Sequence, residues 1–363
     1  MNEQDALAYK EFRKFDFGAG FSDPRVFVRF GVFSKDEKYI ICGCGVGLIR
    51  YEIATGNIIR STSCNRVDEM DISSDGTLIV SAFMATVIVW RIEGLEPFIC
   101  FVLTGINNNI NAVKLIQLGS ITSQYFILTA SRNPVVKMWN FKHECVREFT
   151  SHKSPVYDIS VFSCINRFAS FDDIGSIKFW NSENGDLLGT MHVSIGGHCR
   201  SIAVTQNGLN IAVVTRGGII DLCTTATHRV IRHFKHRDTE SPVLNSVNLI
   251  KFNHDDSLIA SVGYDCTAKI FQVASGECLQ KFTMTEDIQS VFFSANSDKL
   301  VLIAGGFRRS MHVYSPLHTL IPNFYFFQTW TTLSQKKTAH RMPRDAIRLI
   351  GVYMFKSTLS KPT

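Results

Sequence analysis

Short stretches of alternating hydrophobic and polar residues recur along the chain, and turns rich in Asp, Gly and Ser separate them. Residues 32–51, 70–90 and 250–271 follow one plan: an apolar alternating run, a polar Asp-rich turn, a second run, a short Gly or polar turn, and a third run that ends in an aromatic residue. Alternation with a period of two is typical of half-buried β-strands, and Gly supplies the positive φ of tight turns. The pattern therefore predicts β-strands joined by hairpins.

This plan repeats along most of the chain. Seven residues mark the ends of the third runs, 39 to 49 positions apart: Tyr51, Trp90, Trp139, Trp180, Cys223, Phe271 and Tyr314. A short fourth run follows most of them after a Gly-containing turn, as in residues 54–59, 183–188 and 274–279. Four short strands at a period in the forties make one blade of a propeller, because a single four-stranded sheet cannot bury its faces alone. The sequence predicts an all-β fold, a seven-bladed β-propeller with four-stranded antiparallel blades.

Over residues 27–315 the repeat resembles that of the WD40-repeat family. The Gly-His dipeptide of the family precedes one first strand as Gly197-His198, whereas no third strand ends in Trp-Asp. In the family, a His, a Ser, an Asp and the Trp of one blade form a hydrogen-bonded network that stiffens the blade. The resemblance assigns such a network to the fourth blade, with these members: His152, Ser170, Asp173 and Trp180.

The ends of the chain compete to close the ring, because the last predicted blade has only three strands of its own. Residues 12–17 alternate aromatic and charged side chains, as a half-buried strand does, whereas the apolar run 320–330 would close the ring from the other side. We favour the N-terminal segment. The predicted organisation is an N-terminal segment that closes the ring, a propeller and a C-terminal tail: residues 1–26, 27–315 and 316–363.

Charge is distributed unevenly between the propeller and the tail. The chain carries 38 basic and 32 acidic residues, a net charge of +6. From residue 328 onward seven basic residues accompany one acid, Asp345, so the tail accounts for the whole excess. The sequence thus assigns any nucleic-acid binding to the basic tail and gives no support to such binding elsewhere.

The tail contains one predicted helix, over residues 342–355, with Pro343 near its start and a broad apolar face. The segment resembles the opening helix of an F-box at these positions: Met342, Pro343, Ile347, Ile350, Tyr353 and Met354. The resemblance implies binding to the adaptor subunit of a cullin-type ubiquitin ligase. The alternative is a helix that packs on the rim of the propeller.

Catalytic and cofactor motifs are absent: the sequence has no Gly-rich phosphate loop before a helix, no GxSxG elbow and no HExxH. His228, His233 and His236 lie close together, but no Cys pair accompanies them, and we interpret them as solvated loop residues rather than zinc ligands. Asp172 and Asp173 are interpreted as turn formers. No convergent set of acids or His residues can be assigned to a central channel. The sequence predicts a protein without enzymatic activity, bound metal or cofactor.

The cysteine pattern and the N-terminus favour an intracellular location. The ten Cys include no CxxC pair, and the polar residues 1–10 differ from a secretory signal. No run of 18 apolar residues predicts a membrane span. We expect a protein of the cytoplasm or nucleus that does not contact membranes.

The turns between second and third strands lie on one face of a propeller, where rigid scaffolds commonly bind partners. Their bulky and basic side chains are typical of protein interfaces and give the candidate binding face: Met84, Arg132, Arg216, Tyr264, Phe307, Arg308 and Arg309. We expect a non-catalytic scaffold that assembles a macromolecular complex of other proteins. The alternative is a substrate receptor of a cullin-type ubiquitin ligase that uses the F-box-like helix.

Overall fold

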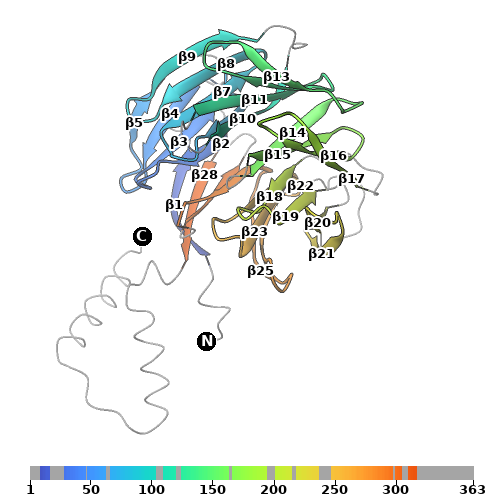
Figure 1. Ribbon diagram of the computed structural model, residues 1–363. Helices are drawn as coiled ribbons and strands as arrows, with labels where there is room; N and C mark the ends of the chain where they lie inside the picture. Colours follow the sequence, from blue (N-terminus) through green and yellow to red (C-terminus); the bar gives the residue numbers. More distant parts are fainter. Residues whose placement is uncertain are drawn as a thin grey trace, which may run out of the picture. The chain divides into compact units, whose positions relative to one another are not determined.

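In the described part of the computed structural model, the regular structure consists of 28 β-strands (Figure 1). The structure describes residues 9–16, 28–45, 47–62, 66–103, 109–119, 124–162, 166–193, 201–214, 218–236, 247–296, 299–304 and 310–316. All of these lie in one unit that spans residues 1–316, while residues 317–363 form a second unit. The predicted helix over residues 342–355 lies outside the described residues.

Six sheets follow one another along the chain, each with four consecutive strands in antiparallel order. Blade 1 comprises β2 (Val28–Phe33), β3 (Tyr39–Cys44), β4 (Gly47–Glu52) and β5 (Ile58–Ser61). Blade 2 comprises β6 (Glu69–Ile72), β7 (Leu78–Phe83), β8 (Thr86–Arg91) and β9 (Glu96–Val102). Blade 3 comprises β10 (Ile110–Leu118), β11 (Gln124–Ser131), β12 (Val136–Trp139) and β13 (Cys145–Phe149).

The next three sheets repeat this order, with the first strand innermost and the fourth outermost. Blade 4 comprises β14 (Val156–Phe162), β15 (Arg167–Asp172), β16 (Ser176–Asn181) and β17 (Leu187–His192). Blade 5 comprises β18 (Ile202–Val204), β19 (Asn210–Val214), β20 (Ile219–Thr224) and β21 (Val230–Lys235). Blade 6 comprises β22 (Val247–Phe252), β23 (Leu258–Gly263), β24 (Thr267–Gln272) and β25 (Cys278–Thr283).

Blade 7 joins the two ends of the propeller. It contains β26 (Ile288–Phe293), β27 (Leu300–Ala304) and β28 (Ser310–Pro316), and its fourth strand is the N-terminal β1 (Tyr9–Asp16). The blue β1 lies antiparallel beside the orange β28, with Tyr9 opposite Pro316 and Asp16 opposite Ser310 (Figure 1). The N-terminal segment therefore supplies the outer strand of the last blade. The competing run 320–330 lies outside the described residues.

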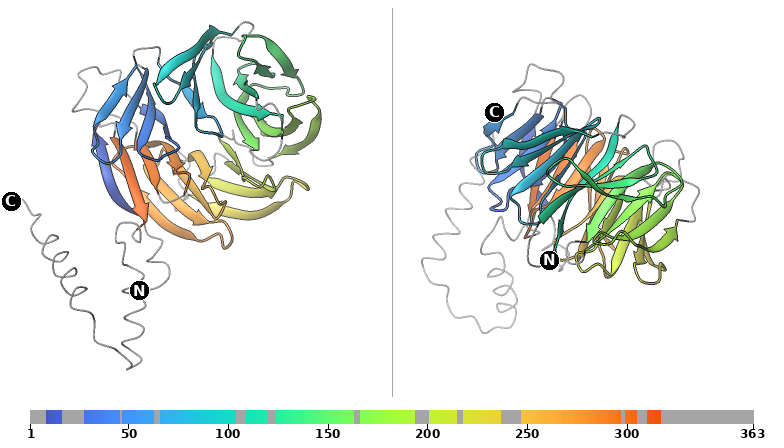
Figure 2. Two further views of the ribbon diagram at one scale, coloured as in Figure 1. Left: turned by 60° about the vertical axis from the view of Figure 1, so that its left-hand side comes forward. Right: turned by 45° about the horizontal axis from the view of Figure 1, so that its top comes forward.

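The predicted fold class, a seven-bladed propeller of four-stranded antiparallel blades, is confirmed. Each of the seven residues taken as a third-strand end lies in the third strand of its blade, within two positions of that strand's last residue. The left view of Figure 2 shows the sheets following one another around a centre, with the orange strands of blade 7 beside the blue strands of blade 1.

Apolar side chains between neighbouring blades hold the ring together. The described residues form seven buried clusters, one between each pair of adjacent blades. Between blades 3 and 4, the ring of Phe149 packs edge-on against Phe168 and Trp180, with centroids 4.8 and 5.3 Å apart. Between blades 7 and 1, Val301 and Met311 pack with Ile40 and other residues of blade 1. Every blade thus buries both faces, which a separate four-stranded sheet could not do.

Arginines on three blades add polar contacts to the next blade. Arg13 of β1 donates to the carbonyl oxygens of Ala54 and Thr55 in blade 1, at 2.6 and 2.8 Å. Arg50 donates to Glu93 O in blade 2 at 3.1 Å, and Arg232 donates to Ser275 O in blade 6 at 2.6 Å. Each arginine satisfies a carbonyl of the turn that precedes the fourth strand. These contacts fix neighbouring blades relative to one another.

A buried hydrogen-bonded network stiffens blade 4. Trp180 Nε1 donates to Ser170 Oγ at 2.8 Å, and the two ring nitrogens of His152 lie 2.6 Å from Ser170 Oγ and 2.8 Å from Asp172 Oδ2. The carboxylate is that of Asp172, not the predicted Asp173. Because strand residues two apart share a face, Asp172 points to the same side of β15 as Ser170, whereas Asp173 lies in the following turn.

Blade 6 has a related network that includes His236. The interpretation of His236 as a solvated loop residue is therefore wrong. His236 is 3% exposed, and its ring nitrogens lie 2.6 Å from Ser261 Oγ and 3.3 Å from Asp265 Oδ1. The third strand of this blade ends near Phe271, whose ring has no N–H donor. Blades 2 and 3 contain the tryptophan part of the network, with Trp90 donating to Ser81 Oγ and Trp139 to Thr129 Oγ1.

Removing the central hydroxyl of blade 4 tests what this network contributes. We expect Ser170→Ala to lower the free energy of unfolding by about 2–3 kcal/mol, because it leaves both the Trp180 N–H and the His152 ring without a partner. The matched control, Ser81→Ala, removes a tryptophan partner only, and we expect a loss of about 1–2 kcal/mol. Urea denaturation of both variants measures the difference. Equal losses would show that His152 adds nothing.

Candidate functional site

The inner strands of the blades surround a cavity of about 770 Å³. Side chains of β2, β6, β10, β14, β22 and β26 line it. A second cavity of about 480 Å³ shares Asp71, Lys114 and Lys251 with the first and extends past β18. The propeller therefore encloses a central channel with charged side chains in its wall.

The same β-bulge occurs at the second residue of five inner strands. A bulge turns one extra side chain away from the regular alternation, and such bulges are common beside functional sites. All five bulged residues line the cavity, and we call them the entrance ring: Arg29, Asn111, Tyr157, Asn248 and Gln289. The inner strands begin at this end, so the ring surrounds the mouth of the cavity.

Three members of the entrance ring also connect neighbouring blades. Asn111 Nδ2 donates to Val156 O at 2.8 Å, and Asn248 Nδ2 donates to Gln289 O at 2.9 Å. Arg29 of blade 1 forms a 3.3 Å ion pair with Asp68, which directly precedes β6 of blade 2 and also pairs with Arg66 at 2.6 Å. The mouth is therefore held in a defined shape by polar contacts of its own residues.

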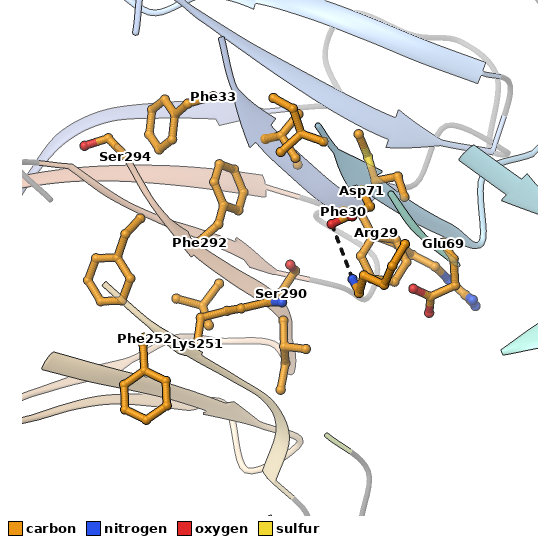
Figure 3. A pocket seen from close by; sticks show the side chains of 18 of the residues that line it. Arg29, Phe30, Phe33, Glu69, Asp71, Lys251, Phe252, Ser290, Phe292 and Ser294 are labelled. Atoms are coloured by element: carbon orange, nitrogen blue, oxygen red, sulfur yellow. Dashed lines mark hydrogen bonds and ion pairs between the residues drawn. The ribbon is translucent and has the colours of Figure 1, made fainter. Parts of the chain in front are cut away.

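Below the mouth, three carboxylates and two ammonium groups converge from four strands. We call them the channel cluster: Glu69 and Asp71 of β6, Lys114 of β10, Asp158 of β14 and Lys251 of β22. The three carboxylates form a convergent set of acids in the channel, which no local pattern in the sequence had indicated. Figure 3 shows Glu69 and Asp71 near Arg29 at one end of the cavity, and the aromatic rings of Phe33, Phe252 and Phe292 toward the other.

Two acids of the channel cluster have structural partners. Asp71 lies 3.5 Å from Lys114 Nζ and accepts the backbone N–H of Leu115 at 2.9 Å. Asp158 accepts the backbone N–H of Ile202 at 2.9 Å. These N–H groups lie on inner strands, which lack a neighbouring strand on the channel side. Each carboxylate thus accepts a hydrogen bond from a backbone N–H group on the unpaired inner edge of the next blade.

Glu69 differs from these acids. Within the described part of the chain, its carboxylate makes neither a hydrogen bond nor an ion pair. Burial raises the pKa of Glu69 to about 8; Lys114 and Lys251 oppose this shift, and Asp158 and Asp68 add to it. Burial also raises the pKa of Asp158 and lowers that of Lys251. For Lys114 burial acts downward, but Asp71, Asp158 and Glu69 raise the pKa above its usual value.

Three of the seven residues predicted for the binding face lie in described turns at the mouth end. Met84, between β7 and β8, is 55% exposed, Arg132 is exposed between β11 and β12, and Tyr264 lines the cavity. Ile110 N donates to Met84 O at 2.9 Å, which places this turn beside the start of an inner strand. The other four lie outside the described residues: Arg216, Phe307, Arg308 and Arg309. The six F-box-like positions also lie outside them.

Sequence reasoning missed two exposed side chains at the same end. Ile174 is 67% exposed in the β15–β16 turn, and Tyr157 is 44% exposed in the entrance ring. Asp173 N donates to Pro155 O at 3.0 Å, so this turn lies beside the start of β14. The isoleucine between Asp173 and Gly175 could have been recognised from the sequence as a candidate binding residue, because turns seldom hold β-branched apolar residues. The bulge at Tyr157 had no such signal.

Metal binding and membrane crossing find no support in the described residues. No group of three or more His, Cys, Asp or Glu among them could hold a metal ion. No described helix combines the length and hydropathy needed to cross a bilayer. Of the three clustered histidines, His228 stacks on Phe179 with centroids 5.1 Å apart, and His233 lies 2.7 Å from Asp221.

The ionisation of Glu69 gives the propeller a pH-dependent stability. The folded pKa is about 8 and the ordinary value is 4.5, so between these pH values the folded state holds a proton that the unfolded chain has lost. The contribution of Glu69 to stability therefore falls as pH rises from 4.5 to 8. We expect the free energy of unfolding of Glu69→Gln, relative to that of wild type, to rise by about 1–2 kcal/mol from pH 5 to pH 8.5. Urea denaturation at both pH values measures this change. A difference that does not change with pH would contradict this assignment.

Comparison with known families supports the repeat assignment in blade 6. The model of the WD domain, G-beta repeat family matches residues 229–272. The matched segment runs from the outer strand of blade 5 to the third strand of blade 6, that is, from β21 to β24. It contains His236, Ser261 and Asp265, the members of the blade 6 network.

Two curated proteins are similar to parts of the chain. The pre-mRNA-processing factor 17 of Saccharomyces cerevisiae is 28% identical over 72 residues, 19% of this chain and 16% of that protein. The WD repeat-containing protein 91 homolog of Dictyostelium discoideum is 25% identical over 223 residues, 59% of this chain and 27% of that protein. The chain spans less than a third of the length of either relative. The chain thus combines a β-propeller of seven four-stranded blades with a repeat that matches the WD domain, G-beta repeat family model.

Proposed function

We propose that the protein is a non-catalytic scaffold that binds other proteins at the mouth of its central cavity. One observation carries this proposal: five bulged side chains surround the mouth, and the exposed Met84 and Ile174 lie in turns at the same end. Large apolar and aromatic side chains on a rigid frame are the usual anchors of protein interfaces. The scaffold would bring proteins of one complex together on this face.

The proposal that the scaffold is not an enzyme rests on the roles of the channel acids. A carboxyl of raised pKa next to lysines is an arrangement that also occurs in active sites. Here, however, Asp71 and Asp158 hold backbone N–H groups of the next blade. Glu69 makes no hydrogen bond to a nucleophilic side chain among the described residues. No cofactor is proposed.

The intracellular location, in the cytoplasm or the nucleus, is part of the same proposal. The described cysteines form no disulfide, and Cys100, Cys145 and Cys278 are exposed, which suits a reducing compartment. The name of the yeast relative refers to pre-mRNA processing. A related role in this chain is one form that the scaffold function could take.

A substrate receptor of a cullin-type ubiquitin ligase is the second candidate. Its support is the pattern of Met342, Pro343 and Tyr353 in the basic tail, which resembles the opening helix of an F-box. In this version the propeller binds the substrate and the tail binds the ligase adaptor. Deleting residues 317–363 separates the candidates: selective loss of a ligase adaptor supports the receptor, and selective loss of RNA supports nucleic-acid binding by the tail.

Affinity capture with a face variant tests the scaffold directly. We expect the triple variant Met84→Ala, Tyr157→Ala, Ile174→Ala to recover the specific protein partners at least about fivefold less than wild type, because it truncates anchors on one face. Quantitative mass spectrometry of the captured proteins measures the change. The matched control, Leu187→Ala with Leu188→Ala, removes exposed apolar side chains from an outer strand and should leave recovery unchanged. Equal recovery by wild type and the triple variant would refute this binding face.

A further inference from the structure

The wall of the central cavity carries as many positive as negative side chains. Its acids and bases are Asp68, Glu69, Asp71, Asp158, Arg29, Lys35, Lys114 and Lys251. Arg29 forms a 3.3 Å ion pair with Asp68. Lys114 forms a 3.5 Å ion pair with Asp71. A ligand of this cavity should therefore have no net charge, because an ion would leave one unit of charge unbalanced in a confined space.

Two opposite charges in the wall lack such a partner. Asp158 accepts the backbone N–H of Ile202 at 2.9 Å, and Lys35 is exposed to solvent. Glu69 and Lys251 are both partly buried, and within the described part of the chain neither makes a hydrogen bond or an ion pair. Burial raises the pKa of Glu69 and lowers that of Lys251, so the surroundings disfavour the charged form of each. Both groups would gain from an opposite charge that a ligand supplies.

Glu69 and Lys251 lie on different sides of the cavity. Glu69 begins β6 of blade 2, whereas Lys251 is the fifth residue of β22 in blade 6. Blades 7 and 1 lie between them on the shorter way around the ring. Figure 3 shows the long side chain of Lys251 extending into the cavity, toward the end at which Glu69 lies. A ligand between them therefore needs a positive group for one side and a negative group for the other.

Three phenylalanines add an apolar part to the same wall. Phe30, Phe252 and Phe292 line the cavity, and Figure 3 shows the last two on the side from which Lys251 extends. Rings of this kind favour an apolar or aromatic group of a ligand, through hydrophobic contact and ring packing. The volume of about 770 Å³ lies within the range of about 300–1,000 Å³ that is usual for small-molecule sites. The cavity thus combines two opposite charges, an apolar surface and room for a small molecule.

We propose that this cavity binds a free amino acid with an apolar or aromatic side chain, whose ammonium group pairs with Glu69 and whose carboxylate pairs with Lys251. Such a zwitterion has no net charge and supplies both missing counter-charges at once. Its side chain packs against the phenylalanine rings. The proposed protein-binding face stays accessible, because Met84 and Ile174 do not line this cavity in the part of the chain that the structure describes.

Calorimetric titration of the full chain with L-phenylalanine and two analogues tests the proposal. The analogue 2-phenylethylamine lacks the carboxylate, and 3-phenylpropionate lacks the ammonium group, while all three compounds keep the phenyl ring. At pH 8 we expect L-phenylalanine to bind about tenfold or more tightly than either analogue, because each analogue leaves one charged group of the wall without its partner. Equal affinity for the three compounds, or no saturable binding of L-phenylalanine, would overturn the proposal.

Two variants separate the roles of the two charges. We expect Glu69→Gln to bind L-phenylalanine and 3-phenylpropionate about equally, and to keep the preference over 2-phenylethylamine. For Lys251→Met we expect the reverse: about equal binding of L-phenylalanine and 2-phenylethylamine, with the preference over 3-phenylpropionate retained. The matched controls, Glu93→Gln and Lys142→Met, change exposed groups in the β8–β9 and β12–β13 turns and should behave as wild type.

Unchanged preferences in Glu69→Gln and Lys251→Met would contradict the assigned pairing, and so would the loss of both preferences in a variant that remains folded. The three affinities of wild type test the site without any variant. Failure of these titrations leaves the proposed scaffold function standing, because capture of proteins by the triple face variant tests that function separately.

Discussion

Apolar packing between neighbouring blades is the interaction on which every other feature of the propeller depends. Each four-stranded sheet has two apolar faces and can bury both only between two other sheets. The seven clusters of described residues occupy the seven junctions, including the junction between blades 7 and 1. Burial of a side chain such as Phe149 or Ile40 contributes about 1.5–3 kcal/mol each. Polar contacts such as that of Arg13 with blade 1 then fix the alignment.

The same packing creates the candidate site. Because the blades lean on one another around an axis, their first strands stand side by side without a partner on the inner edge. Side chains such as Asp71 and Asp158 satisfy part of that edge, and the bulges turn others toward the mouth. The charged cavity is thus a consequence of ring geometry, and Glu69 is the acid of its cluster that the ring leaves without a described hydrogen bond.

The fold could be predicted from the sequence because the same local pattern of strand and turn residues recurs along the chain. The alternation of hydrophobic and polar residues and the turn residues locate each strand along the chain. The residues at the third-strand ends, most of them aromatic, give the period of the repeat. The site could be predicted only in part. The carboxylate partner of His152 was displaced by one residue, because the choice between Asp172 and Asp173 depends on where β15 ends. Lys114 and Glu69 lie 45 positions apart, and nothing local indicates that both face one channel.

Native-state hydrogen exchange measures the closure of the ring most directly. In a closed ring every blade has two neighbours, so the inner strands of blades 1 and 7 should open with about the same free energy as those of blades 3 and 4. Slow exchange of β2 and β26, matching that of β10 and β14, is the predicted result. Fast exchange confined to β1, β2 and the strands of blade 7 would show that the last blade is not sealed to the first.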